Sequence, residues 1–67
     1  MNGPELRKKY MKQIGIGDTL IEPSGVLHVK SVTECIGGVR IIYEPGDVER
    51  TYWTGELYEL INKLIKT

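Results

Sequence analysis

The chain has 67 residues and a mass of 7.6 kDa, which is enough for one small domain spanning residues 1–67 and excludes a multidomain enzyme. Its composition, with 40% hydrophobic and 27% charged residues, is typical of a globular protein and excludes a disordered tail. Nine basic residues balance nine acidic ones, so the net charge does not mark a nucleic-acid or membrane binder.

The first expected element is a helix over residues 4–13. Pro4 suits the first helical position, where a backbone N–H is not needed. Leu6, Tyr10 and Ile14 recur on one flank of this helix, and lysines gather on the opposite side. A helix of about ten residues is marginal alone, so we expect it to dock on the rest of the domain.

Four strands are expected within residues 17–54. Clusters of proline, glycine and aspartate separate them at Pro23-Ser24-Gly25, Gly37-Gly38 and Pro45-Gly46-Asp47. The predicted strands cover residues 19–22, 26–35, 39–44 and 48–53. The alternation of the second strand breaks near Lys30 and Ser31, which indicates a β-bulge there. Because the turns are short, neighbouring strands are antiparallel and the sheet is a meander.

A second helix is expected over residues 55–66, with Thr54 as its N-cap. Its apolar residues recur at i, i+3, i+4, i+7 and i+8, which is the pattern of a helix that packs on a core. These residues are Leu57, Leu60, Ile61, Leu64 and Ile65.

The order of elements predicts an α+β domain. Four short strands bury little apolar surface as a flat sheet, so we expect a small antiparallel four-stranded meander curled into an SH3-like open barrel. An N-terminal and a C-terminal helix flank this barrel. The alternative is a four-stranded sheet with both helices on one face.

Two segments resemble known proteins. Ile16-Gly17-Asp18-Thr19-Leu20-Ile21, followed by Pro23-Ser24-Gly25, resembles the opening hairpin of many SH3-like barrels. Tyr52-Trp53-Thr54-Gly55-Glu56-Leu57, which runs into a helix, is similar to small phage- or prophage-encoded proteins of this architecture. The resemblance covers about Gly17 to Leu57 and implies a small barrel of phage or prophage type, and for a protein of that origin the modulation of a host protein is a natural role.

Two RNA-binding relatives of this architecture fit less well. The Asp-x-x-x-Asn type of signature that Sm-like proteins use to contact RNA is missing from the second hairpin. KOW modules are strongly basic, whereas residues 14–55 contain six acidic residues and three basic ones.

His28 and Cys35 are the two obvious reactive side chains, and they lie seven positions apart in one predicted strand. They share a face only if a bulge intervenes, and no third residue is positioned to orient them, so we interpret them as a surface histidine and a small apolar residue. A barrel of this size rarely holds a deep cleft. We therefore expect no enzyme activity, no catalytic residue and no small-molecule substrate.

The sequence also argues against a cofactor or a metal. Gly15-Ile16-Gly17 lacks the third glycine of the dinucleotide pattern, because Leu20 occupies that position. Two acidic pairs stand at turns, and such pairs are usually solvated rather than metal ligands. These pairs are Asp18 with Glu22 and Asp47 with Glu49.

The aromatic residues indicate a protein-binding surface. Tyr52 and Trp53 are adjacent in a strand, so their side chains point to opposite faces, and one of them lies outside or under the second helix. Exposed aromatic residues dominate binding hot spots. We expect a non-enzymatic module that binds a protein partner or a second copy as a homodimer. The candidate surface is Tyr43, Arg50, Tyr52 and Trp53.

The basic side of the first helix supports an alternative function. Residues 1–13 carry a net charge of plus three, which suits contacts with the phosphates of DNA or RNA. The residues concerned are Arg7, Lys8, Lys9 and Lys12. Two other interpretations stay open: a solvated helix face, and a face that docks on the acidic barrel of the same or a neighbouring chain.

Cysteine usage and the absence of long apolar runs predict the compartment. Cys35 is the only cysteine, so no intramolecular disulfide forms, which fits a reducing environment. No signal sequence and no run of ~20 apolar residues is visible. We therefore expect a cytoplasmic protein that does not associate with membranes.

Overall fold

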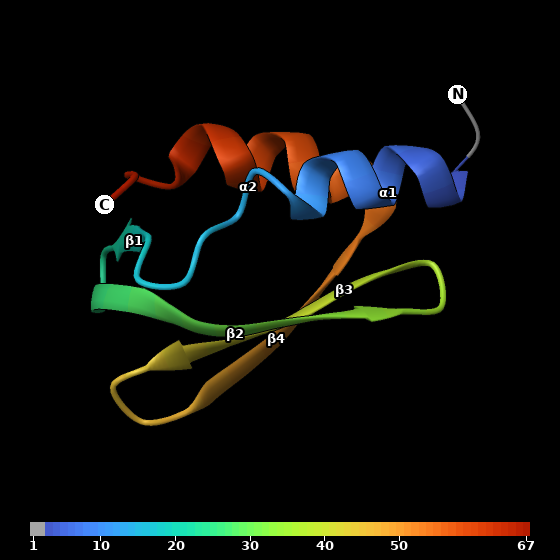
Figure 1. The fold of residues 1–67 in the computed structure, drawn as a ribbon. Coiled ribbons are helices and arrows are strands. Elements are labelled where there is room, and N and C mark those ends of the chain that lie inside the picture. Colours follow the sequence, from blue (N-terminus) through green and yellow to red (C-terminus); the bar gives the residue numbers. More distant parts are fainter. Residues whose placement is uncertain (1–2) are drawn as a thin grey trace.

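A computed structural model describes residues 3–67, which form one curled antiparallel sheet with a helix at each end of the chain (Figure 1). The expected α+β class is confirmed. In chain order the elements are α1 (Gly3–Met11), β1 (Thr19–Glu22), β2 (Gly25–Cys35), β3 (Gly38–Glu44), β4 (Val48–Trp53), the 3-10 turn η1 (Thr54–Glu56) and α2 (Leu57–Lys63).

The sheet is a meander in which the strands lie in the order β1-β2-β3-β4. The expected bulge is present between Val29 and Ser31, because Val29 pairs with Tyr43 whereas Ser31 pairs with the adjacent Ile42. One extra residue restores the register, so that Val29 and Val32 both contribute to the core. The long strand β2 therefore bends while keeping its apolar residues on the inner side of the sheet.

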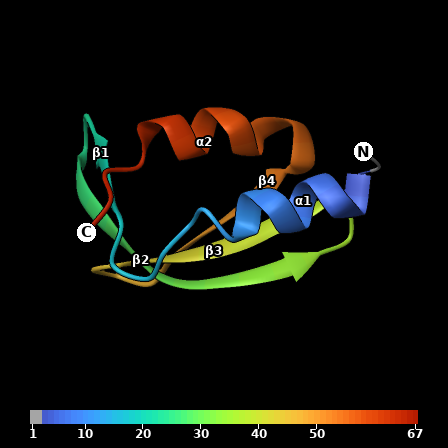
Figure 2. The ribbon, with the colours of Figure 1, turned by 45° about the horizontal axis from the view of Figure 1, so that its top comes forward.

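Both helices cover the same concave face of the sheet, where they lie side by side (Figures 1 and 2). The rings of Tyr10 in α1 and Tyr58 in α2 have centroids 6.5 Å apart. The curled sheet is a half-barrel that is compatible with an SH3-like fold, and β1 does not pair with β4 to close it. The structure therefore has the curled sheet that we expected for the open barrel and, as in the alternative prediction, both helices on one face of the sheet.

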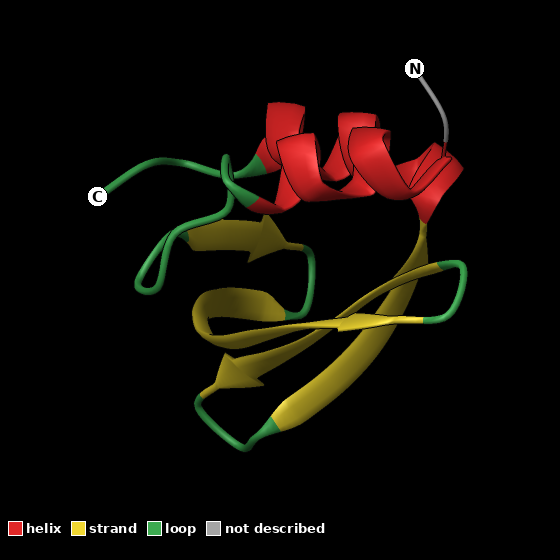
Figure 3. Cartoon of the chain, turned by 45° about the vertical axis from the view of Figure 1, so that its right-hand side comes forward, coloured by secondary structure: helices red, strands yellow, loops and turns green. Residues whose placement is uncertain are grey.

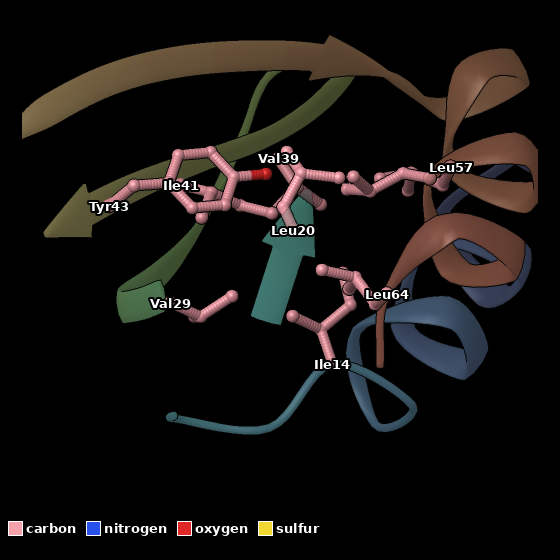
Figure 4. Close-up of a cluster of buried hydrophobic side chains, with 9 residues drawn as sticks. Ile14, Leu20, Val29, Val39, Ile41, Tyr43, Leu57 and Leu64 are labelled. Atoms are coloured by element: carbon pink, nitrogen blue, oxygen red, sulfur yellow. The ribbon is translucent and has the colours of Figure 1, made fainter. Parts of the chain in front are cut away.

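The core fills the space between the concave face and α2 (Figure 4). Its buried members come from the loop after α1, from β1, β2 and β3, from α2 and from the residue directly after α2: Ile14, Leu20, Val29, Val39, Ile41, Tyr43, Leu57, Leu60 and Leu64. The close pairing of β3 with β4 depends on Gly38, because a Cβ atom there would lie 2.1 Å from the carbonyl oxygen of Tyr52.

The second helix is shorter than the predicted span of 55–66. It ends at Lys63, and Leu64 is already extended with a ψ of 134°. Ile65 then exchanges two backbone hydrogen bonds with Thr19 of β1, at 2.9 and 2.8 Å. The C-terminal segment thus covers part of the edge of β1, and these tertiary hydrogen bonds replace the last helical turn.

No residue of the first helix is fully buried, but Tyr10 and Met11 pack against the core, and Arg7 adds two polar contacts that anchor the helix. Arg7 Nε lies 2.8 Å from a carboxylate oxygen of Glu34 in β2. Arg7 Nη1 donates a hydrogen bond of 3.3 Å to the hydroxyl of Thr54. These contacts fix α1 over the end of the sheet where β2 turns into β3. Across residues 3–67, no helix has the length and apolar character needed to cross a bilayer.

Candidate functional site

Strand β4 has an inner and an outer side, and its burial alternates strictly along the chain. Val48, Arg50 and Tyr52 are half-buried and share the inner side, which faces the helices. The intervening residues are exposed on the outer, convex side: Glu49, Thr51 and Trp53. A partner that packs on one face of β4 therefore contacts only one of these two sets of side chains.

The four residues predicted as one binding surface do not form one. Tyr43 is fully buried, and its hydroxyl lies 2.7 Å from the hydroxyl of Tyr52. The two rings pack edge to face at 6.5 Å. Burial, followed by the hydrogen bond to Tyr52, raises the pKa of Tyr43 well above its ordinary value, so this phenol stays neutral. Tyr43 and Tyr52 are structural residues of the inner side, and only Trp53 lies on the outer side.

Arg50 is also engaged within the chain. Its guanidinium binds both carboxylate oxygens of Glu22 in β1, at 2.5 and 2.7 Å, and its Cζ lies 5.9 Å from the centroid of the Tyr43 ring. The hydrogen bond from Arg50 lowers the pKa of the Glu22 carboxyl, so the pair stays charged at neutral pH. This fork spans the open side of the half-barrel between β1 and β4, where no backbone pairing joins them.

A cleft of about 180 Å³ lies beside this ion pair, between β1, β4 and α2. Ligand pockets usually have about 300–1,000 Å³, so this cleft is too small to enclose a typical metabolite. Its lining mixes acidic and basic side chains with two leucines: Leu20, Glu22, Arg50, Tyr52, Glu56, Glu59, Leu60 and Lys63.

The exposed apolar surface near β4 consists of Ile36, Gly37 and Trp53, and we call it the outer patch. Trp53 keeps 60% of its surface exposed and Ile36 keeps 97%. The Trp53 ring lies against Gly37, where a Cβ atom would be 3.5 Å from ring carbons. Ile36 was not predicted from the sequence, although its position directly before Gly37-Gly38 was a usable signal. Ile36 and Gly37 form the tip of the β2–β3 hairpin, where a side chain has little to pack against.

A second group of exposed apolar side chains lies at the opposite end of the sheet. Ile21 and Val26 are cross-strand partners in the β1–β2 hairpin and are 63% and 49% exposed. Ile65, next to Thr19 on the free side of β1, is 51% exposed. This second group contains only aliphatic side chains and no aromatic or polar one.

The basic residues predicted to contact nucleic acid are divided between two roles. Arg7 has a side chain only 13% exposed and is bound to Glu34, so it holds α1 in place. Lys8 and Lys9 in α1 and Lys12 in the turn directly after it are exposed. Of the four predicted residues, only the three lysines are therefore exposed.

The two reactive side chains predicted from the sequence, His28 and Cys35, do not lie together in the structure. The bulge puts His28 and Cys35 on the same face, but His28 pairs with Glu44 and Cys35 with Gly38, which places them about 20 Å apart along β2. His28 Nδ1 instead lies 3.0 Å from the hydroxyl of Thr19. Within residues 3–67, no three His, Cys, Asp or Glu side chains are grouped to hold a metal ion.

Asp18 differs from the solvated acid that was expected. It is 2% exposed, and its Oδ2 accepts hydrogen bonds of 2.8 Å from the Gly15 amide and from Lys66 Nζ. Burial alone would raise the pKa of this carboxyl, but the hydrogen bonds from Lys66 and Gly15 outweigh it, so the pKa lies below its ordinary value of 3.8. Asp18 therefore ties the loop after α1 to the C-terminal segment.

Comparison with protein-family models, curated protein sequences and solved structures gives no match to this chain. The candidate functions therefore rest on the geometry of the outer patch, of β4 and of α1.

Proposed function

We propose that this domain is a non-enzymatic binding module that contacts another protein chain through the outer patch. The observation that carries the proposal is the exposure of Trp53, the only tryptophan of the chain, beside the still more exposed Ile36. Tryptophan is the residue type most enriched in binding hot spots, and a flanking aliphatic residue helps to exclude water from the contact.

The chemistry of the remaining surface supports binding rather than catalysis. The groups on the inner side are occupied by one another, as in the pairs of Tyr43 with Tyr52 and of Arg50 with Glu22. The cleft beside them is too small for a typical metabolite. No cofactor is part of the proposal.

The resemblance of residues 52–57 to phage- or prophage-encoded proteins supports a host protein as the partner. The single cysteine, Cys35, supports a reducing compartment such as the cytoplasm as the place of action. A homodimer is the other form of the same proposal, since small domains often bury additional apolar surface by association.

The test is capture of binding proteins on immobilised wild-type protein, on Trp53→Ala and on Tyr58→Ala. Tyr58 is a matched control, because it is an aromatic residue of nearly equal exposure, 61%, on α2. We expect Trp53→Ala to weaken binding of the captured partner by about 2 kcal/mol, or roughly thirtyfold, and Tyr58→Ala to leave it unchanged. Equal binding by all three proteins would contradict the proposal.

The fluorescence of Trp53 gives a direct second readout, because no other tryptophan contributes to it. Contact of a partner with the outer patch should shift the emission to shorter wavelength and reduce quenching by acrylamide. An unchanged spectrum in the presence of a bound partner would place the contact elsewhere on the domain.

Three exposed lysines favour nucleic-acid binding as a second candidate function: Lys8 and Lys9 in α1, and Lys12 directly after it. The test is a titration of labelled protein with short DNA and RNA at low and moderate salt, followed by amide NMR. Under this hypothesis, shifts are confined to α1, decline steeply with salt, and vanish in the double variant Lys8→Glu, Lys12→Glu. Absence of shifts at low salt would exclude it.

A further inference from the structure

Strand β4 is an edge strand with a defined set of outward-facing backbone groups. In the ladder with β3, the amide of Thr54 donates to the carbonyl of Gly37 at 3.0 Å, which fixes the phase of the hydrogen bonds. The backbone N–H and C=O groups of Arg50 and Tyr52 therefore point towards β3. Those of Glu49 and Thr51 point away from it.

A second contact confirms this phase. The amide of Trp53 points away from β3 and donates to the side chain of Glu56 at 2.9 Å. Among residues 3–67, no strand lies on the far side of β4, which runs along the border of the sheet into η1 (Figure 3). The N–H and C=O groups of Glu49 and Thr51 thus form an open template for another strand.

From these contacts we propose that the partner of β4 is a second copy of this chain, paired antiparallel through β4 with Thr51 opposite Thr51 of the other copy. This inference rests on the proposed function, because it names the chain that contacts the surface around Trp53. Two β4 strands would join two half-barrels into one continuous sheet across a two-fold axis.

The side chains of β4 select this register among those that a two-fold axis allows. Centring the pair on Glu49 or on Arg50 opposes two like charges directly, which is destabilising. Centring it on Tyr52 or Trp53 runs the pair into η1, which ends the strand and shortens the overlap. Centring it on Thr51 opposes no like charges and keeps the overlap within β4; Glu49 then lies opposite Trp53, whose amide stays bound to Glu56.

Complementary side chains face each other in this register. Arg50 of one copy lies opposite Tyr52 of the other on the inner side, and Glu49 lies opposite Trp53 on the outer side. Glu49 is bound to Arg40 at 2.9 Å, so the exposed Trp53 ring of the second copy meets an ion pair whose guanidinium suits an aromatic face. The inward-pointing charge of Arg50, which would normally discourage strand addition, is neutralised by Glu22.

The first test is amide hydrogen exchange measured by NMR at high and low protein concentration. We expect the amides of Thr51 and Glu49 to exchange at least about tenfold more slowly at high concentration and to lose this protection on dilution. The amides of Arg50 and Tyr52, which are bonded to β3, are internal controls and stay protected at both concentrations.

The second test uses charge at position 51, measured by sedimentation velocity as the fraction with twice the 7.6 kDa mass of the chain. Thr51→Lys places two lysines opposite each other and should weaken self-association about fivefold, and Thr51→Glu should have the same effect with two glutamates. An equimolar mixture of the two variants places lysine opposite glutamate and should associate at least as well as wild type. Thr33→Lys, an exposed threonine on the outer side of β2, is the matched control and should have no effect.

The outcomes separate this inference from the proposed function. A protein that stays monomeric at NMR concentrations, or a dimer that Thr51→Lys leaves unchanged, overturns the inference. If Thr51→Lys strengthens the dimer, position 51 lies opposite Glu49 in a different register, and this result also overturns the inference. If binding of a different protein still depends on Trp53 in these cases, the proposed function survives alone; if nothing depends on Trp53, both fail.

Discussion

Replacement of Asp18 by asparagine tests whether one buried carboxylate holds the two ends of the chain together. The asparagine keeps the shape and one acceptor oxygen but loses the negative charge that receives hydrogen bonds from Gly15 and Lys66. Hydrogen bonds to a charged group contribute about 1.5–3 kcal/mol and neutral ones about 0.5–1.5 kcal/mol. Lys66 is half exposed, so its share is small, and we expect Asp18→Asn to lower the free energy of unfolding by about 1–2 kcal/mol at pH 7.

The dependence of this loss on pH follows from the lowered pKa of Asp18. In the unfolded chain the carboxyl takes up a proton near its ordinary pKa of 3.8, and in the folded protein it does so only at lower pH. The stability that Asp18 contributes is therefore complete well above pH 3.8 and is lost as the pH falls through the folded-state pKa. Below that pH, wild type and Asp18→Asn should differ far less in stability than at pH 7.

The measurement is urea unfolding of both proteins, followed by circular dichroism between pH 2 and pH 7. Asp47→Asn is the matched control, because Asp47 is an exposed carboxylate bound to Lys30, and its φ of 49° is tolerated by asparagine. We expect this control to change the free energy of unfolding by less than about 0.5 kcal/mol. Equal effects of the two substitutions, or an Asp18→Asn effect that does not shrink in acid, would refute the reasoning.

Three further predictions concern the core and β4, each measured by urea unfolding. Leu57→Ala removes a fully buried side chain and should lower the free energy of unfolding by about 3 kcal/mol; a loss below about 1 kcal/mol would mean that Leu57 is not in the core. Tyr43→Phe breaks the hydroxyl pair with Tyr52 and should cost about 1 kcal/mol, less if Tyr52 turns to water. Trp53→Ala should cost about 1 kcal/mol or less, because most of the ring is exposed; a larger loss would make Trp53 structural.

Local patterns in the sequence were sufficient for the sheet. The turn clusters and branched residues predicted the strands to within a residue, and the break in alternation located the bulge at Lys30 and Ser31. These features depend on neighbours in sequence: proline and glycine fix turn dihedrals, and alternation fixes which side chains share a face. Such information is present in any window of about ten residues.

Contacts between distant residues were not predictable in the same way. Arg7 looked like one of four surface cations, and only its pairing with Glu34, 27 positions away, shows that it anchors α1. The helix over 55–66 has an unbroken apolar period, yet it stops at Lys63 because Ile65 pairs with Thr19. In both cases a tertiary hydrogen bond overrides a local preference, and its energy depends on a partner that no local window contains.

In the candidate surface on β4, too, one part could be predicted from the sequence and another could not. Positions 50 and 52 were grouped with position 53 because the sequence left open which of Tyr52 and Trp53 is exposed, and the structure places the first two on the side opposite the third. The structure assigns the inner side of β4 to stability, through Tyr52 and Arg50, and leaves the outer side and the free edge, through Trp53 and Thr51, open to a partner. Substitutions at even positions of β4 should therefore act mainly on unfolding, and those at odd positions mainly on binding. A strand that separates the two roles by parity lets its binding surface change without loss of the fold.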